Sequence, residues 1–170
     1  MKTSKAIAAF WPVLLGLVAV DCTTKRLIVE SLPPHVPHPV IGDVVRFTLA
    51  YNPDAAMGLS LGAYSRIGFA VIALVVLGGL LINRRRITEG NGARSIAIAL
   101  IAGGAIGNLI DRVRSSRGVV DFIDVGIGNA RFYTFNVADA SVFCGAVLLL
   151  LLLAGQEKNS EPADAQHLDR

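Results

Sequence analysis

Residues 67–82 read IGFAVIALVVLGGLLI, an uncharged apolar run that is followed almost at once by Arg84-Arg85-Arg86. With its flanking residues, the run reaches the roughly 17 residues that a helix needs to cross the hydrocarbon core of a bilayer. The composition agrees, because 53% of the 170 residues are hydrophobic and only 17% are charged, which is unlike a soluble domain. The chain is therefore predicted to be an integral membrane protein.

Three more uncharged apolar runs have the same character, at residues 6–20, 95–110 and 140–155. Together the runs predict an all-α membrane protein with four transmembrane helices, at about residues 6–28, 63–82, 94–111 and 137–155. Residues 1–155 would then form one membrane domain. The polar, aperiodic residues 156–170 are expected to be a disordered cytoplasmic tail.

The first apolar run follows Lys2 and Lys5, as the core of a secretory signal peptide would. However, Asp21 and Cys22 stand where a cleavage site needs small residues, so the run is interpreted as a retained helix. For the same reason the chain is not expected to be a lipoprotein itself. Cys22 and Cys144, far apart and without paired spacing, are interpreted as small buried side chains.

The positive charges predict an orientation. Arg84-Arg85-Arg86 lie in the short connection after the second span, and cytoplasmic connections are enriched in Lys and Arg. Lys2, Lys5 and Arg94 support this, so both termini are placed in the cytoplasm. The opposite side also carries Arg112, Arg114, Arg117 and Arg131, which is an exception to this charge rule. Contacts with lipid head groups would account for the first three. Membrane phospholipid is thus an expected partner, and nucleic acid is not.

An up-and-down bundle places the ends of odd spans and the starts of even spans on one side of the membrane. This rule gathers the unusual polar residues of the chain at the outer side. They are Asp21, Lys25, Asn52, Asp54, Asn108, Asp111, Arg112, Asp121, Asn136 and Asp139. Two β-rich runs on the same side, residues 40–51 and 118–123, predict a small sheet on the membrane surface.

Asp121 and Asp139 differ from the other outer carboxylates. No basic residue lies within three positions of either one, and their neighbours are mostly apolar. Such surroundings raise a carboxyl pKa by desolvation, and two close carboxylates share a proton. The ionised member could then activate water while the protonated member protonates a scissile carbonyl. From the residues alone, two unrelated interfacial aspartates are the alternative.

Structural roles are expected for the remaining charged residues at the helix ends. Asp21 and Lys25 have the i,i+4 spacing of an ion pair on one helix face. Asn108, Asp111 and Arg112 have similar spacings and would form a local polar cluster that orders the outer loop.

Two competing chemistries have weak support. Gly58-Leu59-Ser60-Leu61-Gly62 matches the nucleophile elbow of serine hydrolases, which requires a histidine base. His35 and His38 lie in a proline-rich outer loop, and His167 lies in the tail. The first two histidines also have no carboxylate or cysteine at metal-ligand spacing, so no metal and no cofactor are expected.

Five motifs in order resemble those of bacterial lipoprotein signal peptidase, also called signal peptidase II. They are Asp21-Cys22-Thr23-Thr24-Lys25, Tyr51-Asn52-Pro53-Asp54-Ala55-Ala56, Gly104 to Arg112, Val119-Val120-Asp121-Phe122 and Phe135-Asn136-Val137-Ala138-Asp139. The resemblance implies four transmembrane helices with a small extracytoplasmic β-rich cradle, in the bacterial inner membrane.

The resemblance also implies a function and a site. It implies an aspartic endopeptidase that cuts lipid-modified prolipoproteins before the diacylglyceryl-bearing cysteine, with Asp121 and Asp139 as the catalytic pair. Asn52, Asn108, Arg112, Asn136 and Ala138 would line the substrate site. A monomer is expected.

The chain departs from the pattern of this family at Asp54 and Met57, where glycine and an aromatic residue are usual. The extra carboxylate could alter peptide preference. The rival class is a small transporter or proton pathway that uses Asp21, Asp111 and Asp139 to bind ions. A non-enzymatic scaffold is a third class, and it predicts that the carboxylates are dispensable.

Overall fold

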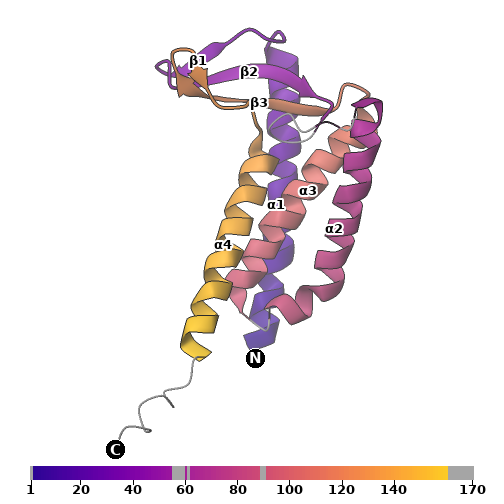
Figure 1. The fold of residues 1–170 in the computed structure, drawn as a ribbon, viewed down its shortest axis with the longest axis vertical. Coiled ribbons are helices and arrows are strands. Elements are labelled where there is room, and N and C mark those ends of the chain that lie inside the picture. The colour runs from indigo at the N-terminus through magenta and orange to yellow at the C-terminus, as the bar shows by residue number, and fades with distance from the viewer. Residues whose placement is uncertain (1, 55–59, 61, 89–90, 161–170) are drawn as a thin grey trace, which may run out of the picture.

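A computed structural model of the chain describes residues 2–54, 60, 62–88 and 91–160. Four long helices pack side by side, and an antiparallel sheet lies across one end of them (Figure 1). The helices are α1 (Lys2–Ser31), α2 (Ser65–Thr88), α3 (Gly92–Arg114) and α4 (Val137–Ser160), and a short 3-10 helix, η2 (Gly62–Tyr64), precedes α2.

The sheet has the order β1-β2-β3-β4, with strands β1 (His38–Ile41), β2 (Val45–Asn52), β3 (Val119–Ile127) and β4 (Ala130–Arg131). The two predicted β-rich runs are therefore confirmed as strands that pair with each other. Ile28 near the end of α1 packs against Leu49, Val120 and Phe122 of the sheet. This small apolar core fixes the sheet over the helix ends.

α3 lies between α2 and α4, with α1 behind it, and it contacts all three (Figure 1). Close approach is possible because α3 has no side chains at Gly103, Gly104 and Gly107. A Cβ at Gly104 would lie 2.4 Å from the carbonyl oxygen of Ala138 in α4, and one at Gly103 would lie 2.8 Å from Leu17 Cδ2 in α1. Small residues at such spacing are the usual basis of helix packing in membranes.

Within the described residues, three of the four long helices are long and apolar enough to cross a membrane by length and composition: α2, α3 and α4, the last over Val137–Gln156. Only 6% of the most apolar 18-residue stretch of α2 is buried inside the protein, so most of its apolar side chains stay at least partly exposed. This is the surface distribution expected when lipid is the solvent. Multi-pass membrane insertion is thus supported by composition and by packing.

Two predicted boundaries are wrong. α2 continues through Arg84-Arg85-Arg86 to Thr88, whereas these arginines were predicted to lie in the connection after the second span. α4 continues to Ser160, so residues 156–160 extend the helix rather than begin a disordered tail. Arg, Gln, Glu and Lys are good helix formers, and polarity alone does not end a helix. Residues 161–170 of the predicted tail lie outside the described residues.

Candidate active site

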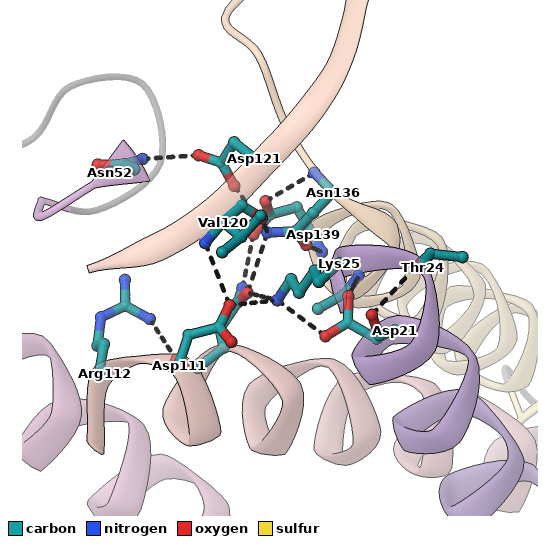
Figure 2. Close-up of polar contacts among 12 residues, drawn as sticks. Asp21, Thr24, Lys25, Asn52, Asp111, Arg112, Val120, Asp121, Asn136 and Asp139 are labelled. Carbon is teal, nitrogen blue, oxygen red and sulfur yellow. Dashed lines mark hydrogen bonds and ion pairs between the residues drawn. The ribbon is translucent and has the colours of Figure 1, made fainter. Parts of the chain in front are cut away.

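The polar residues predicted at the outer side meet where the sheet joins the ends of α1 and α3 and the start of α4 (Figure 2). Asp21 and Lys25 come from α1, and Asn108, Asp111 and Arg112 from α3. Asn52 ends β2, Asp121 belongs to β3, and Asn136, Ala138 and Asp139 surround the start of α4. The bundle rule thus correctly predicted which residues share one end.

Strand pairing positions Asp121. It lies opposite Ala50 in β2, and Val119 lies opposite Asn52, so Asn52 and Asp121 are diagonal neighbours on one face. Nδ2 of Asn52 donates a 3.1 Å hydrogen bond to Oδ2 of Asp121. A register shift between Phe47 and Ala50 sets this alignment, as β-bulges do next to many active sites. Asp121 is only 3% exposed.

The start of α4 positions Asp139. Asn136 precedes the helix, and its Oδ1 accepts a 2.9 Å hydrogen bond from the backbone N–H of Asp139. In return, Oδ2 of Asp139 accepts a 3.2 Å bond from the backbone N–H of Asn136. This reciprocal capping box holds the carboxylate on the first turn. Oδ1 of Asp139 also accepts a 2.7 Å bond from Nδ2 of Asn108 in α3.

Asn136 links the two aspartates. While its Oδ1 holds Asp139, its Nδ2 donates to Oδ1 of Asp121 at 2.7 Å and lies 3.1 Å from Oδ1 of Asn108. Asn136 is fully buried, so water does not compete for these bonds. Figure 2 shows Asp121 on the strand and Asp139 at the start of the helix, gathered with Asn136 at the junction of the two elements.

The electrostatics of the site favour a shared proton. Burial and, second to it, the nearby charge of Asp139 together raise the pKa of Asp121 to about 7. Hydrogen bonds from Asn52 and Asn136 oppose the rise because they stabilise the ionised form. A carboxyl group of this kind is partly protonated at neutral pH.

A second polar group lies directly beneath, centred on Lys25. Its Nζ lies 2.8 Å from Oδ2 of Asp21, as the i,i+4 spacing predicted, and 2.9 Å from Oδ2 of Asp111. It also donates a 3.0 Å hydrogen bond to Oδ1 of Asn108. Lys25 is almost completely buried, so one cation joins α1 to α3 and contacts the amide that holds Asp139.

The predicted cluster of Asn108, Asp111 and Arg112 is only partly correct. Arg112 does donate to the carbonyl oxygen of Asn108, at 3.3 Å. Asp111, however, binds Lys25 and accepts a 3.1 Å bond from the backbone N–H of Val120. The side chain of Asp111 therefore holds β3, the strand that carries Asp121. Contacts with other elements, rather than the spacing along α3, determine the partners of Asp111.

Asp21 is fully buried, and its Oδ1 accepts a 2.9 Å bond from the backbone N–H of Ala138. A Cβ at Gly107 would lie only 2.5 Å from Oδ2 of Asp21, so the missing side chain admits this carboxylate. The role of Gly107 was not predicted, although its spacing of four from Gly103 was visible. Ala138 is itself fully buried against Gly104 and Gly107 of α3.

Arg112 reaches the loop after β2. Its Nη2 donates a 3.0 Å bond to the carbonyl oxygen of Asp54, while the N–H of Asp54 binds Oδ1 of Asn52 at 3.0 Å. Arg66 was not predicted at all, and it donates to the carbonyl oxygens of Arg112 and Ser115, joining the start of α2 to the end of α3. Met57, the other departure from the family pattern, lies outside the described residues.

The serine alternative gains no support from the geometry. Ser60 donates to Oδ1 of Asp54 at 2.8 Å, and its oxygen lies 3.2 Å from that of Ser65. Within the part of the chain that the structure describes, no hydrogen bond joins Ser60 to a histidine. Gly58, Leu59 and Leu61 of that motif lie outside the described residues. The cysteine prediction is wrong for Cys144, which is exposed on the outer surface of α4.

Comparison with known proteins identifies relatives along most of the chain. The family model described as signal peptidase (SPase) II matches residues 13–154. The lipoprotein signal peptidase of Halothermothrix orenii is 41% identical over 146 residues, which cover 86% of this chain and 95% of that protein. The lipoprotein signal peptidase of Pseudomonas putida is 40% identical, with 92% of each chain covered.

A solved structure agrees with these matches. A bacterial membrane enzyme determined by the in meso method at 2.3 Å resolution superposes with a TM-score of 0.79 and 31% sequence identity. The match covers 88% of this chain and 89% of that one. The similarity therefore extends over the helices and the sheet together.

Proposed function

This chain belongs to the signal peptidase II family, and we propose that it removes signal peptides from lipid-modified prolipoproteins in the bacterial inner membrane. The proposed reaction is hydrolysis of the peptide bond before the diacylglyceryl-bearing cysteine. Asp121 and Asp139 are the proposed catalytic residues. The observation that carries the proposal is the buried amide of Asn136, which binds both of them.

The mechanism uses the different surroundings of the two carboxyl groups. Asp121, whose pKa is raised to about 7 by burial and by the nearby Asp139, carries the shared proton and donates it to the scissile carbonyl oxygen. Both oxygens of Asp139 accept N–H hydrogen bonds, as those of a carboxylate do. Asp139 removes a proton from water, and the resulting hydroxide attacks the carbonyl carbon.

The tetrahedral diol then collapses. Asp139 passes its proton to the amide nitrogen as the C–N bond breaks, and Asp121 recovers a proton from the diol. The new amine leaves on the lipid-bearing cysteine, and the new acid leaves on the signal peptide. The cycle consumes one water, forms no covalent intermediate and returns the original proton distribution.

Supporting roles follow from the contacts. Asn108 and Asn136 orient the aspartates, and Asn52 holds Asp121 from the neighbouring strand. Lys25 with its two carboxylate partners fixes α1 against α3. Arg112 joins the loop at Asp54 to the end of α3 and would border the bound peptide, whereas Ala138 is fully buried and packs against α3.

The proposed topology places the sheet as a cradle on the outer face and α1 as a fourth span. Arg84, Arg85 and Arg86 lie at the opposite end of the bundle, as does the start of α1 (Figure 1), which favours cytoplasmic termini. The aspartates then lie near head-group depth. Since one chain contributes every residue of the site, a monomer suffices for the reaction.

The transporter alternative is less well supported. Asp21 and Asp111 bind the ammonium of Lys25, and the three side chains are largely buried. A carboxylate pair that already holds a buried cation is not poised to exchange ions. The scaffold alternative does not account for the raised pKa of Asp121.

The decisive experiment compares two otherwise identical precursors, one carrying the diacylglyceryl group and one without it. The lipid supplies roughly 0.8 kcal/mol per buried methylene, and it also fixes the depth of the scissile bond. We expect rapid cleavage of the lipidated precursor by the purified chain and very poor turnover of the other, even at saturation. Equal saturated rates would show that the lipid contributes affinity alone, and no cleavage of either precursor would refute the function.

A further inference from the structure

The end of the bundle opposite the sheet contains an open groove of about 670 Å³ between α2, the start of α3 and the end of α4. The groove is lined by the apolar residues Val76, Leu80 and Leu153 and by two arginines, Arg86 and Arg94. These residues belong to the second half of α2, the start of α3 and the end of α4, whereas Asp139 lies in the first turn of α4 and Asp121 in β3, at the other end of the helices (Figure 1). The proposed peptidase mechanism makes no use of them.

We propose that this groove binds an anionic phospholipid, with an acyl chain along the apolar wall and the phosphate at the two arginines. The inference is independent of the peptidase activity. It requires only that α2, α3 and α4 cross a membrane, for which they are long and apolar enough.

The dimensions of the groove suit a lipid of one leaflet. Val76 and Arg86 lie ten residues apart on α2, which corresponds to about 15 Å along a helix. Half of a hydrocarbon core of about 30 Å has the same depth. Val76 is 51% exposed and Leu153 is 38% exposed, so the protein leaves apolar surface for an acyl chain to cover.

The two arginines of the groove suit the phosphate of a lipid head group. Arg86 is exposed, and no carboxylate among the described residues forms an ion pair with it. Arg94 is held in place, since its guanidinium donates to the carbonyl oxygens of Ile87 and Leu152 and to Oε1 of Gln156. Basic pockets between transmembrane helices on the cytoplasmic side are known to select anionic head groups.

The two arginines disfavour three other possible occupants of the groove: a signal peptide, a second copy of the chain and a zwitterionic lipid. The basic start of a signal peptide would be repelled by Arg86, and a second copy of the chain would bring an identical pair of arginines to the contact. A zwitterionic lipid would fill the apolar wall without gaining from the cations. An anionic lipid satisfies both parts of the groove.

The test measures lipid retention on the purified full-length chain by native mass spectrometry. Phosphatidylglycerol is compared with phosphatidylcholine of the same acyl chains. The variant Arg86→Gln removes the head-group contact, and Arg85→Gln is the matched control, because Arg85 is also exposed but does not line the groove. In a second pair of variants, Val76→Trp fills the groove, and Val75→Trp is the control because Val75 does not line it.

Wild type and Arg85→Gln should prefer phosphatidylglycerol, and Arg86→Gln should bind it about fivefold more weakly, with phosphatidylcholine unaffected. Val76→Trp should lose retained lipid and Val75→Trp should not. Each variant should cleave precursor within twofold of wild type, which shows that it is folded. Equal retention of the two lipids by wild type, or equal losses in Arg85→Gln and Arg86→Gln, would overturn the proposal.

The lipid proposal is also overturned if the groove proves to be a contact between copies of the chain or a site for free phosphate. If light scattering shows that Val76→Trp converts a dimer into a monomer, the groove is a contact between copies. If inorganic phosphate at matched ionic strength displaces no phosphatidylglycerol, the acyl chain contributes to binding as proposed. Complete displacement would instead identify a phosphate site without a lipid requirement.

Discussion

Nδ2 of Asn136 donates a 2.7 Å hydrogen bond to Oδ1 of Asp121 across the junction between α4 and β3. Because the same side chain caps the helix that carries Asp139, a single buried amide fixes the relative positions of both carboxyl groups. The separation of the two aspartates therefore depends on where the sheet docks on the bundle.

The first prediction concerns the pair itself. Asp121→Asn and Asp139→Asn should each lower kcat by about 100-fold or more, because an amide neither shares the proton nor acts as a base. The variants should remain folded, as judged by thermal unfolding in detergent. Turnover near wild type in either one would refute the pair.

Asp124→Asn is the matched control. Asp124 lies on the same strand and is also buried, but it binds Arg131 and Thr48 rather than the pair. Its loss should cost about 1–3 kcal/mol of stability because a charged hydrogen bond is removed. Cleavage per folded molecule should stay close to that of wild type.

The second prediction concerns pH. Asp121 has a pKa raised to about 7, so the protonated form needed for catalysis is lost as the pH rises through that value, and kcat should fall there. Asn52→Ala removes a hydrogen bond that lowers the pKa, so the proton is held to higher pH. The midpoint of the alkaline limb should therefore move upward, whatever the change in absolute rate. A downward shift would contradict the assignment of the proton to Asp121.

The same raised pKa has a consequence for stability. The folded state holds a proton that the unfolded chain releases near its ordinary pKa of 3.8, so this group favours the folded state at low pH. That contribution is progressively lost as the pH rises from about 4 to about 7. Asp121→Asn should flatten this part of the stability profile.

The third prediction separates Asp111 from the chemistry. Asp111→Asn should lower stability by about 1–3 kcal/mol, because it weakens the contact with Lys25 and the bond to the N–H of Val120. Turnover per folded molecule should be less affected than in the variants of the pair. Glu30→Gln, which alters only an exposed ion pair with Arg26, should leave the unfolding midpoint unchanged. Loss of turnover by Asp111→Asn at unchanged stability would show a direct chemical role.

The fourth prediction addresses the serine alternative. Ser60→Ala should retain activity, and serine-directed reagents and chelators should not inhibit, because the proposed mechanism uses neither a serine nor a metal. Ser60 binds Asp54, so a modest change in KM is compatible with a role in loop structure. A large fall in kcat for Ser60→Ala would revive the serine mechanism.

Local patterns in the sequence determined the membrane class, the order of the helices and the end at which the polar residues meet. Hydropathy and helical spacing act over short stretches, so they identified the apolar runs and the ion pair of Asp21 with Lys25. The family resemblance selected Asp121 and Asp139, which local patterns alone left as one of two interpretations.

Only the tertiary structure decided which distant groups touch. Lys25 also binds Asp111 and Asn108 in another helix, and Asn136 joins a strand to a helix. These contacts depend on how closely α3 approaches its neighbours, which Gly107 permits by leaving room for Asp21. The groove beside Arg86 likewise exists because α2 packs on α3 and leaves space before α4. Hydropathy measures how apolar the surface of a helix is, whereas shape complementarity between helices determines which side chains meet.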